Sequence, residues 1–199
     1  MSVDLVHQPG RKPMSVIPSQ EEWDVMERTA KLLIDAKMLP PHLDTPAKVI
    51  GIFITGRELG IGMITSTKQI YPTGDGKTGI QAALMRALCY KNIPGFQLQI
   101  EQSTDRLCKG RAKRGNGEWT SFTFSMEDAE RAQLTGKRAW KQYPKAQLIA
   151  RVTSALCNIV GPDAILGCYT PEELSIEAET KVVNPVTVNG TVQEDGTDE

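Results

Sequence analysis

Three runs of alternating polar and apolar residues between Phe96 and Ser125 place the strongest constraint on the fold. The run "FQLQIEQS" sets Phe96, Leu98 and Ile100 on one side and polar residues on the other. The runs "DRLCKGRAKRG" and "EWTSFTFS" flank a Gly-Asn-Gly turn at residues 115–117. A period of two is typical of a half-buried strand, and glycine with asparagine closes tight hairpins. The sequence therefore predicts an antiparallel meander with one buried face.

Helical patterns lie on both sides of this meander, and several of them start with a capping residue or a proline. Predicted helices begin near Ser19, Thr45, Gln81, Ser125 and Trp140, and the last of them continues to Val160. A hairpin is predicted between the second and third helices, over residues 64–80. The order of helices, hairpin, helix, meander and helices indicates an α+β fold, with small antiparallel sheets or hairpins packed with several helices.

Composition and periodicity divide the chain into a core and two tails. The 199 residues, 40% of them hydrophobic, suit one domain of ordinary size. Residues 1–18 and the acidic segment 175–199 lack periodicity and are predicted to be disordered, which leaves residues 19–174 as the core. The sequence has no run of about 18 apolar residues, and its first residues lack the apolar centre of a signal peptide. We therefore expect a cytoplasmic location and no membrane partner.

The stretch "YPTGDGKTG" has the Gly-Lys-Thr ending of a nucleotide-binding loop, formed here by Gly76, Lys77 and Thr78. That loop requires G-x-x-x-x-G-K-[ST], and Tyr71 stands where its first glycine should be. The preceding "TSTKQIYPT" alternates, which is typical of a half-exposed strand entering a hairpin. We interpret the stretch as a surface turn carrying a lysine, without a bound nucleotide.

Covalent chemistry has little support in the sequence. The four cysteines form no C-x-x-C pair, and the two histidines are His7, in the predicted tail, and His42, in a connector. A zinc site would lack a ligand set, and a catalytic cysteine would lack a histidine partner. The acidic residues are scattered, so a metal-dependent nuclease is also disfavoured. We expect a protein that is not an enzyme and that uses no metal or cofactor.

Charge is distributed unevenly although the formal net charge is only −1. Between Ser103 and Arg151 there are eleven basic and five acidic residues, whereas the segment after Leu174 has six acidic residues and one lysine. A basic centre with an acidic tail indicates either a polyanionic partner or ordinary solvated surfaces. The alternation adds a specific candidate, because Lys109, Arg111 and Lys113 share one face of a predicted strand. Cations in such a row can follow a phosphate backbone.

Residues 140–174 carry a longer pattern of Trp, Pro, a basic residue, a helix with Leu and a basic residue, and then PD-x-x-x-G-x-Y-x-x-E-E. The matching residues are Trp140, Pro144, Lys145, Leu148, Arg151, Pro162, Asp163, Gly167, Tyr169, Glu172 and Glu173. This pattern resembles the C-terminal core of the RecT/Redβ family of phage and prophage recombinases. The upstream stretches "GRELGIGMITSTKQIYPTGDGKTGIQAALM" and "FTFSMEDAERAQL" are also similar to the family, so the resemblance covers roughly residues 45–174.

The resemblance implies a protein that binds single-stranded DNA and anneals complementary strands without ATP. It also implies a homo-oligomer, as a ring or helical filament, working in the bacterial host. A phage exonuclease and a host single-strand binding protein are the possible protein partners, and the annealing duplex intermediate is a second nucleic-acid ligand. The acidic tail is open to three interpretations: binding a partner, competing with DNA, or remaining a solvated tail.

Candidate DNA-binding residues come from the resemblance and from the strand face. Lys145 and Arg151 match basic positions of the family's DNA-facing helix, Lys68 and Lys77 match positions around its hairpin, and Arg138 and Lys141 lie beside the motif. Trp140 matches a motif position that is either a base-stacking platform or a core residue. The full set is Lys68, Lys77, Lys109, Arg111, Lys113, Arg138, Trp140, Lys141, Lys145 and Arg151. Ala146 and Asn158 stand where the family commonly has further basic residues.

A second function class remains open from the sequence. A non-catalytic module that binds single-stranded nucleic acid, or that loads a partner, would have the same basic centre without annealing activity. An annealing assay distinguishes this alternative from a recombinase of the strand-annealing kind.

Overall fold

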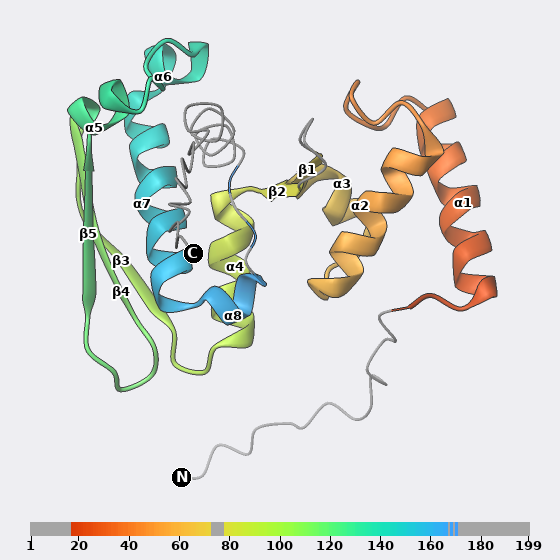
Figure 1. The fold of residues 1–199 in the computed structure, drawn as a ribbon, viewed down its shortest axis with the longest axis horizontal. Coiled ribbons are helices and arrows are strands. Elements are labelled where there is room, and N and C mark those ends of the chain that lie inside the picture. The colour runs from red at the N-terminus through yellow and green to blue at the C-terminus, as the bar shows by residue number, and fades with distance from the viewer. Residues whose placement is uncertain (1–16, 73–77, 167, 169, 171–199) are drawn as a thin grey trace, which may run out of the picture.

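The computed structural model describes residues 17–72, 78–166, 168 and 170. Over these residues the chain is α+β, with helices and two small antiparallel sheets (Figure 1). The helices are α1 (Gln20–Asp35), α2 (Pro46–Glu58), α3 (Met63–Gln69), α4 (Ala82–Asn92), α5 (Met126–Arg131), α6 (Arg138–Gln142), α7 (Pro144–Val160) and α8 (Pro162–Ile165). The strands are β1 (Ile70–Pro72), β2 (Thr78–Ile80), β3 (Gln97–Ser103), β4 (Leu107–Lys113) and β5 (Thr120–Ser125). This confirms the predicted fold class.

The first three helices pack together as the N-terminal part of the molecule (Figure 1). The predicted capping box is present, since Glu22 N donates to Ser19 Oγ at 3.3 Å and Ser19 N donates to the Glu22 carboxylate at 2.8 Å. The same carboxylate accepts from Arg57 of α2 at 2.9 Å, and the Arg57 side chain is only 6% exposed. The hydrogen bond from the Ser19 backbone, followed by that from Arg57, lowers the pKa of Glu22. The Glu22 carboxylate therefore caps the start of α1 and also links α1 to α2.

The described helices include none that is by itself long and apolar enough to cross a membrane. Helices α2 and α3 pass such a test only when taken together, and the chain bends by 105° between them.

Helix α3 replaces part of the predicted hairpin, so the prediction of a strand over the residues before Ile70 was wrong. Only Ile70–Pro72 and Thr78–Ile80 are paired, with Ile70 opposite Ile80. Ser66 and Thr67 are buried, and a Cβ added at Gly56 of α2 would lie 1.8 Å from Ser66 Oγ. Ser66 thus faces a close contact between α2 and α3 instead of solvent. Tertiary packing overrides the local β pattern here.

The predicted meander forms a three-stranded sheet in the order β3-β4-β5. Helix α7 lies along one face of this sheet and α4 lies on the other side of α7, as Figure 1 shows. Gly110 of β4 permits the approach, because a Cβ there would lie 2.9 Å from the Val152 side chain of α7. The sheet is therefore covered by α7 on one face.

The chain breaks where one continuous helix was predicted from Trp140 to Val160. Tyr143 adopts φ −137° and ψ 56°, which ends α6, and Pro144 is the first residue of α7. Proline has no backbone N–H and disfavours a helical conformation in the residue before it. It is therefore favourable at the first position of a helix and unfavourable inside one. As a result, Lys141 and Lys145 belong to different helices, α6 and α7.

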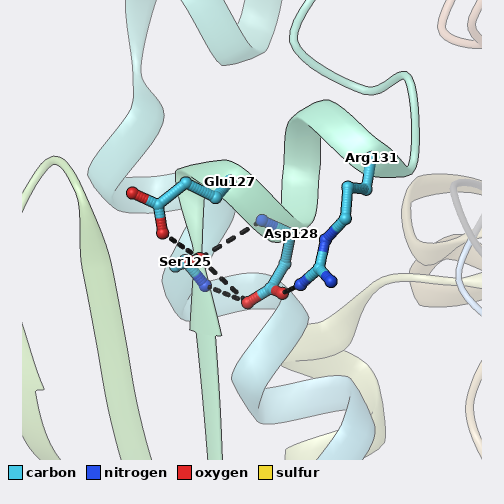
Figure 2. Close-up of polar contacts among 4 residues, drawn as sticks. All are labelled: Ser125, Glu127, Asp128 and Arg131. Carbon is cyan, nitrogen blue, oxygen red and sulfur yellow. Dashed lines mark hydrogen bonds and ion pairs between the residues drawn. The ribbon is translucent and has the colours of Figure 1, made fainter.

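Helix α5 begins directly at the end of β5 through a second capping box, drawn in Figure 2. Ser125 N donates to Asp128 Oδ2 at 2.8 Å, and Asp128 N donates to Ser125 Oγ at 3.2 Å. These bonds from Ser125 are the main cause of the lowered pKa of Asp128. Arg131 also contacts the Asp128 carboxylate, so its positive charge is balanced within α5. The capping box turns the chain from the sheet towards α6.

Candidate nucleic-acid interface

A row of three cations lies on the face of β4 that points away from α7. Residues alternate along this strand between exposed or half-buried positions and buried ones. The outward cations are Lys109, Arg111 and Lys113, and the buried residues between and beside them are Cys108, Gly110 and Ala112. Neighbouring members of such a row are roughly 6.7 Å apart along a strand. We call Lys109, Arg111 and Lys113 the sheet surface.

Neighbouring side chains hold Arg111 in one position. Its Nε and one terminal nitrogen donate to Gln99 Oε1 of β3, at 3.2 and 2.9 Å. Its guanidinium carbon lies 4.3 Å from the ring centroid of Trp119, which also has Lys113 Nζ at 5.0 Å. Cations over an indole ring are held electrostatically without losing their charge. The side chains of the sheet surface are thus partly fixed before any ligand arrives.

A second basic group lies at the junction of α6 and α7. Arg138 and Lys141 come from α6, Lys145 comes from the first turn of α7, and all three are exposed. The Arg138 Nε donates to Gln142 Oε1 at 3.2 Å. Because the glutamine amide is neutral, this hydrogen bond does not neutralise the charge of Arg138. Figure 1 places α6 beyond the end of α7 that lies nearest α5. We call Arg138, Lys141 and Lys145 the helix surface.

Arg151 is separate from both surfaces. It is half-buried on α7, and its guanidinium carbon lies 5.3 Å from the ring centroid of Phe124 on β5. Phe124 belongs to the face of the sheet that α7 covers, because it pairs with the buried Cys108. Arg151 therefore takes part in packing α7 onto the sheet, which the sequence did not indicate.

Trp140 is a core residue and not a stacking platform in this structure. Its side chain is 2% exposed, and its ring lies 6.4 Å from that of Phe124, centroid to centroid. The apolar area of an indole makes burial favourable wherever a helix can bring it to the core, and α6 does so. The core interpretation of Trp140 is therefore confirmed, and in this structure the indole has no open face on which a base could stack. Tyr143, the next aromatic residue in the chain, is 65% exposed.

The remaining two candidates are Lys68 and Lys77. Lys68 is exposed, but it lies on α3 and not on the strand predicted for it. Lys77 lies outside the described residues. The structure thus brings six of the ten candidates together in two groups of three, and it places Arg151, Trp140 and Lys68 elsewhere.

The two surfaces present fixed positive charge and offer no obvious reactive group. Within residues 17–72 and 78–166, and at 168 and 170, no three or more His, Cys, Asp or Glu side chains are grouped as a metal would require. Cys89, Cys108 and Cys157 are free thiols buried in the core. An arrangement of exposed Lys and Arg with a nearby aromatic ring can bind a polyanion by neutralising its charge.

No protein-family model matches the chain, and no curated protein matches it either. The resemblance to RecT/Redβ recombinases accordingly rests on the sequence pattern alone.

If the helix surface contacts single-stranded DNA, as the resemblance implies, replacing Lys141 and Lys145 by glutamine should weaken that binding and leave the fold intact. Both side chains are exposed, so the free energy of unfolding should change by no more than about 0.5 kcal/mol. If each neutralises one phosphate, the slope of log K against log salt should become shallower by about 1.4. Fluorescence titrations at several salt concentrations measure this slope. Glutamines at Lys31 and Lys48 remove the same charge from α1 and α2, and an equal effect there would contradict the assignment.

Proposed function

We propose that this protein binds single-stranded DNA through its phosphate backbone and anneals complementary strands without ATP. The sheet surface is the observation that carries the proposal. An uncovered sheet face usually carries mixed polar residues, whereas the central strand of this one presents a cation at three successive outward positions. Such a row matches the repeating charge of a polynucleotide better than it matches any small anion.

Several features favour a single strand as the ligand. Arg111 and Lys113 lie over the indole ring of Trp119, and aromatic rings near cations are typical of surfaces that hold unpaired bases without reading their sequence. The helix surface adds a second group of exposed cations to the same half of the molecule. A protein that contacts only the phosphate backbone leaves the base edges accessible, so a second strand can pair with them.

Annealing, rather than binding alone, is supported by the resemblance of residues 140–174 to RecT/Redβ recombinases. Under this proposal the protein works as a homo-oligomer in the cytoplasm of a bacterial host, beside an exonuclease that produces single strands. No step of annealing requires a covalent intermediate or a nucleotide cofactor, so the protein is proposed to act as a recombinase without enzymatic chemistry.

The test follows pairing of two complementary oligonucleotides, one with a donor and one with an acceptor dye, in buffer without nucleotide. We expect the protein to raise the annealing rate well above the protein-free rate, and the increase to fall steeply as salt is raised. Binding without faster annealing would support the alternative of a single-strand binding or partner-loading module. An annealing rate equal to the protein-free rate contradicts the proposed recombinase function.

A further inference from the structure

Glu101 lies on the same face of the sheet as the cations of β4, because Gln97 and Gln99, which precede it at intervals of two along β3, pair with Lys113 and Arg111. Strand β3 pairs in order up to Ile100 opposite Gly110, and the next pair is Gln102 opposite Lys109. The irregularity lies between Ile100 and Gln102, so Glu101 is the extra residue of a β-bulge. Alternation along β3 directs the Glu101 carboxylate towards the cations of β4, and the bulge places Gln102 as well as Glu101 opposite Lys109.

The Glu101 carboxylate bridges two members of the sheet surface. One oxygen lies 3.3 Å from Lys109 Nζ and the other lies 3.2 Å from Arg111 Nε. The side chain of Glu101 is 28% exposed, less than either of its partners, at 47% and 36%. The carboxylate thus lies between the two cations and is accessible from the uncovered side of the sheet.

Two anionic oxygens that bridge a lysine and an arginine resemble two oxygens of a phosphodiester in charge and in hydrogen-bonding capacity. Any phosphate that approached Lys109 and Arg111 would meet this carboxylate at the same donors. Both anions cannot remain there, because like charges at such distances repel. Gln99 and Trp119, by contrast, hold Arg111 from other directions and do not compete with a phosphate for charge.

We propose that Lys109 and Arg111 form a backbone phosphate subsite, and that Glu101 occupies it in the free protein and is displaced by the strand. The inference rests on the proposed single-strand binding and adds a residue that limits its affinity. Glu101 keeps the two cations close together and apart from other anions until a polynucleotide, which contacts many sites at once, replaces it. A short or isolated phosphate gains too little to do so.

The test compares Glu101→Gln with the parent and with Glu118→Gln in fluorescence titrations of a labelled oligothymidine at low salt. Glu118 lies in the turn between β4 and β5, so its replacement makes the same change of net charge close to the same surface. We expect Glu101→Gln to tighten binding about fivefold, since exposed ion pairs have about this strength, and Glu118→Gln to tighten it less than about twofold. Glu101→Asp keeps the charge and should stay near the parent.

A double-mutant cycle shows whether the effect passes through the proposed subsite. In a Lys109→Gln, Arg111→Gln background, Glu101→Gln should change affinity no more than Glu118→Gln does. The inference is overturned if Glu101→Gln and Glu118→Gln tighten binding equally, or if the extra effect of Glu101→Gln survives in that background. A parent protein that does not bind oligothymidine at all would instead overturn the proposed function. Melting curves of each variant confirm that the titrations compare folded proteins.

Discussion

Replacing Lys109, Arg111 and Lys113 together by glutamine is expected to remove a large part of the salt-dependent affinity for single-stranded DNA. The three side chains lie on one uncovered strand face, so a single backbone can contact them in succession. Each phosphate contact to a single strand contributes about 0.7 to the slope of log K against log salt, so the slope should become shallower by about 2. Titrations of a labelled oligonucleotide between low and moderate salt measure both the affinity and the slope.

A control variant that loses the same net charge elsewhere distinguishes direct contact with DNA from a general effect of the protein's net charge. Arg28, Lys31 and Lys48 lie on or beside α1 and α2, and Lys31 and Lys48 already pair with Glu27 and Asp44. Glutamines at these three positions should leave the slope almost unchanged. If the two triple variants bind with equal slopes, the sheet surface is not the contact, and the proposed function loses the observation that carries it.

The sheet surface was predictable because alternation along a strand, which can be read from the local sequence, determines which side chains share a face. Once one face of β4 contains Cys108, Gly110 and Ala112 packed against a helix, the residues between them must point the other way. The sequence also shows the turn glycines that divide the meander. The fold class and the cation row both follow from this alternation.

Features that depend on distant contacts were not predictable in the same way. Helix α3 forms over an alternating run because Ser66 approaches Gly56 of a preceding helix, and no local pattern reports that contact. The bulge at Glu101 depends on the register between β3 and β4, which neither strand specifies alone. The break between α6 and α7 does have a local signal, because Pro144 is the first residue of α7 and interrupts the helical spacing around it.

Trp140→Ala is expected to lower the free energy of unfolding by about 3–5 kcal/mol, a large share of the roughly 5–15 kcal/mol that holds a domain of this kind together. The side chain is 2% exposed, lies beside Phe124 and belongs to the main hydrophobic core. Truncation would leave a cavity between α6 and the sheet, next to the ring over which Arg151 lies. Urea denaturation followed by circular dichroism measures the loss.

Trp140→Phe and Tyr143→Ala complete this experiment and distinguish packing from DNA contact. Phenylalanine keeps most of the buried area, and it breaks no hydrogen bond with a described residue, since the Trp140 indole nitrogen has no partner among residues 17–72, 78–166, 168 and 170. It should therefore cost much less than alanine and leave affinity for single strands at the parent level. Tyr143→Ala, at a residue that is 65% exposed, should change stability by less than about 0.5 kcal/mol. A Trp140→Phe protein that is as stable as the parent but no longer binds DNA would show that the indole leaves the core to contact the strand.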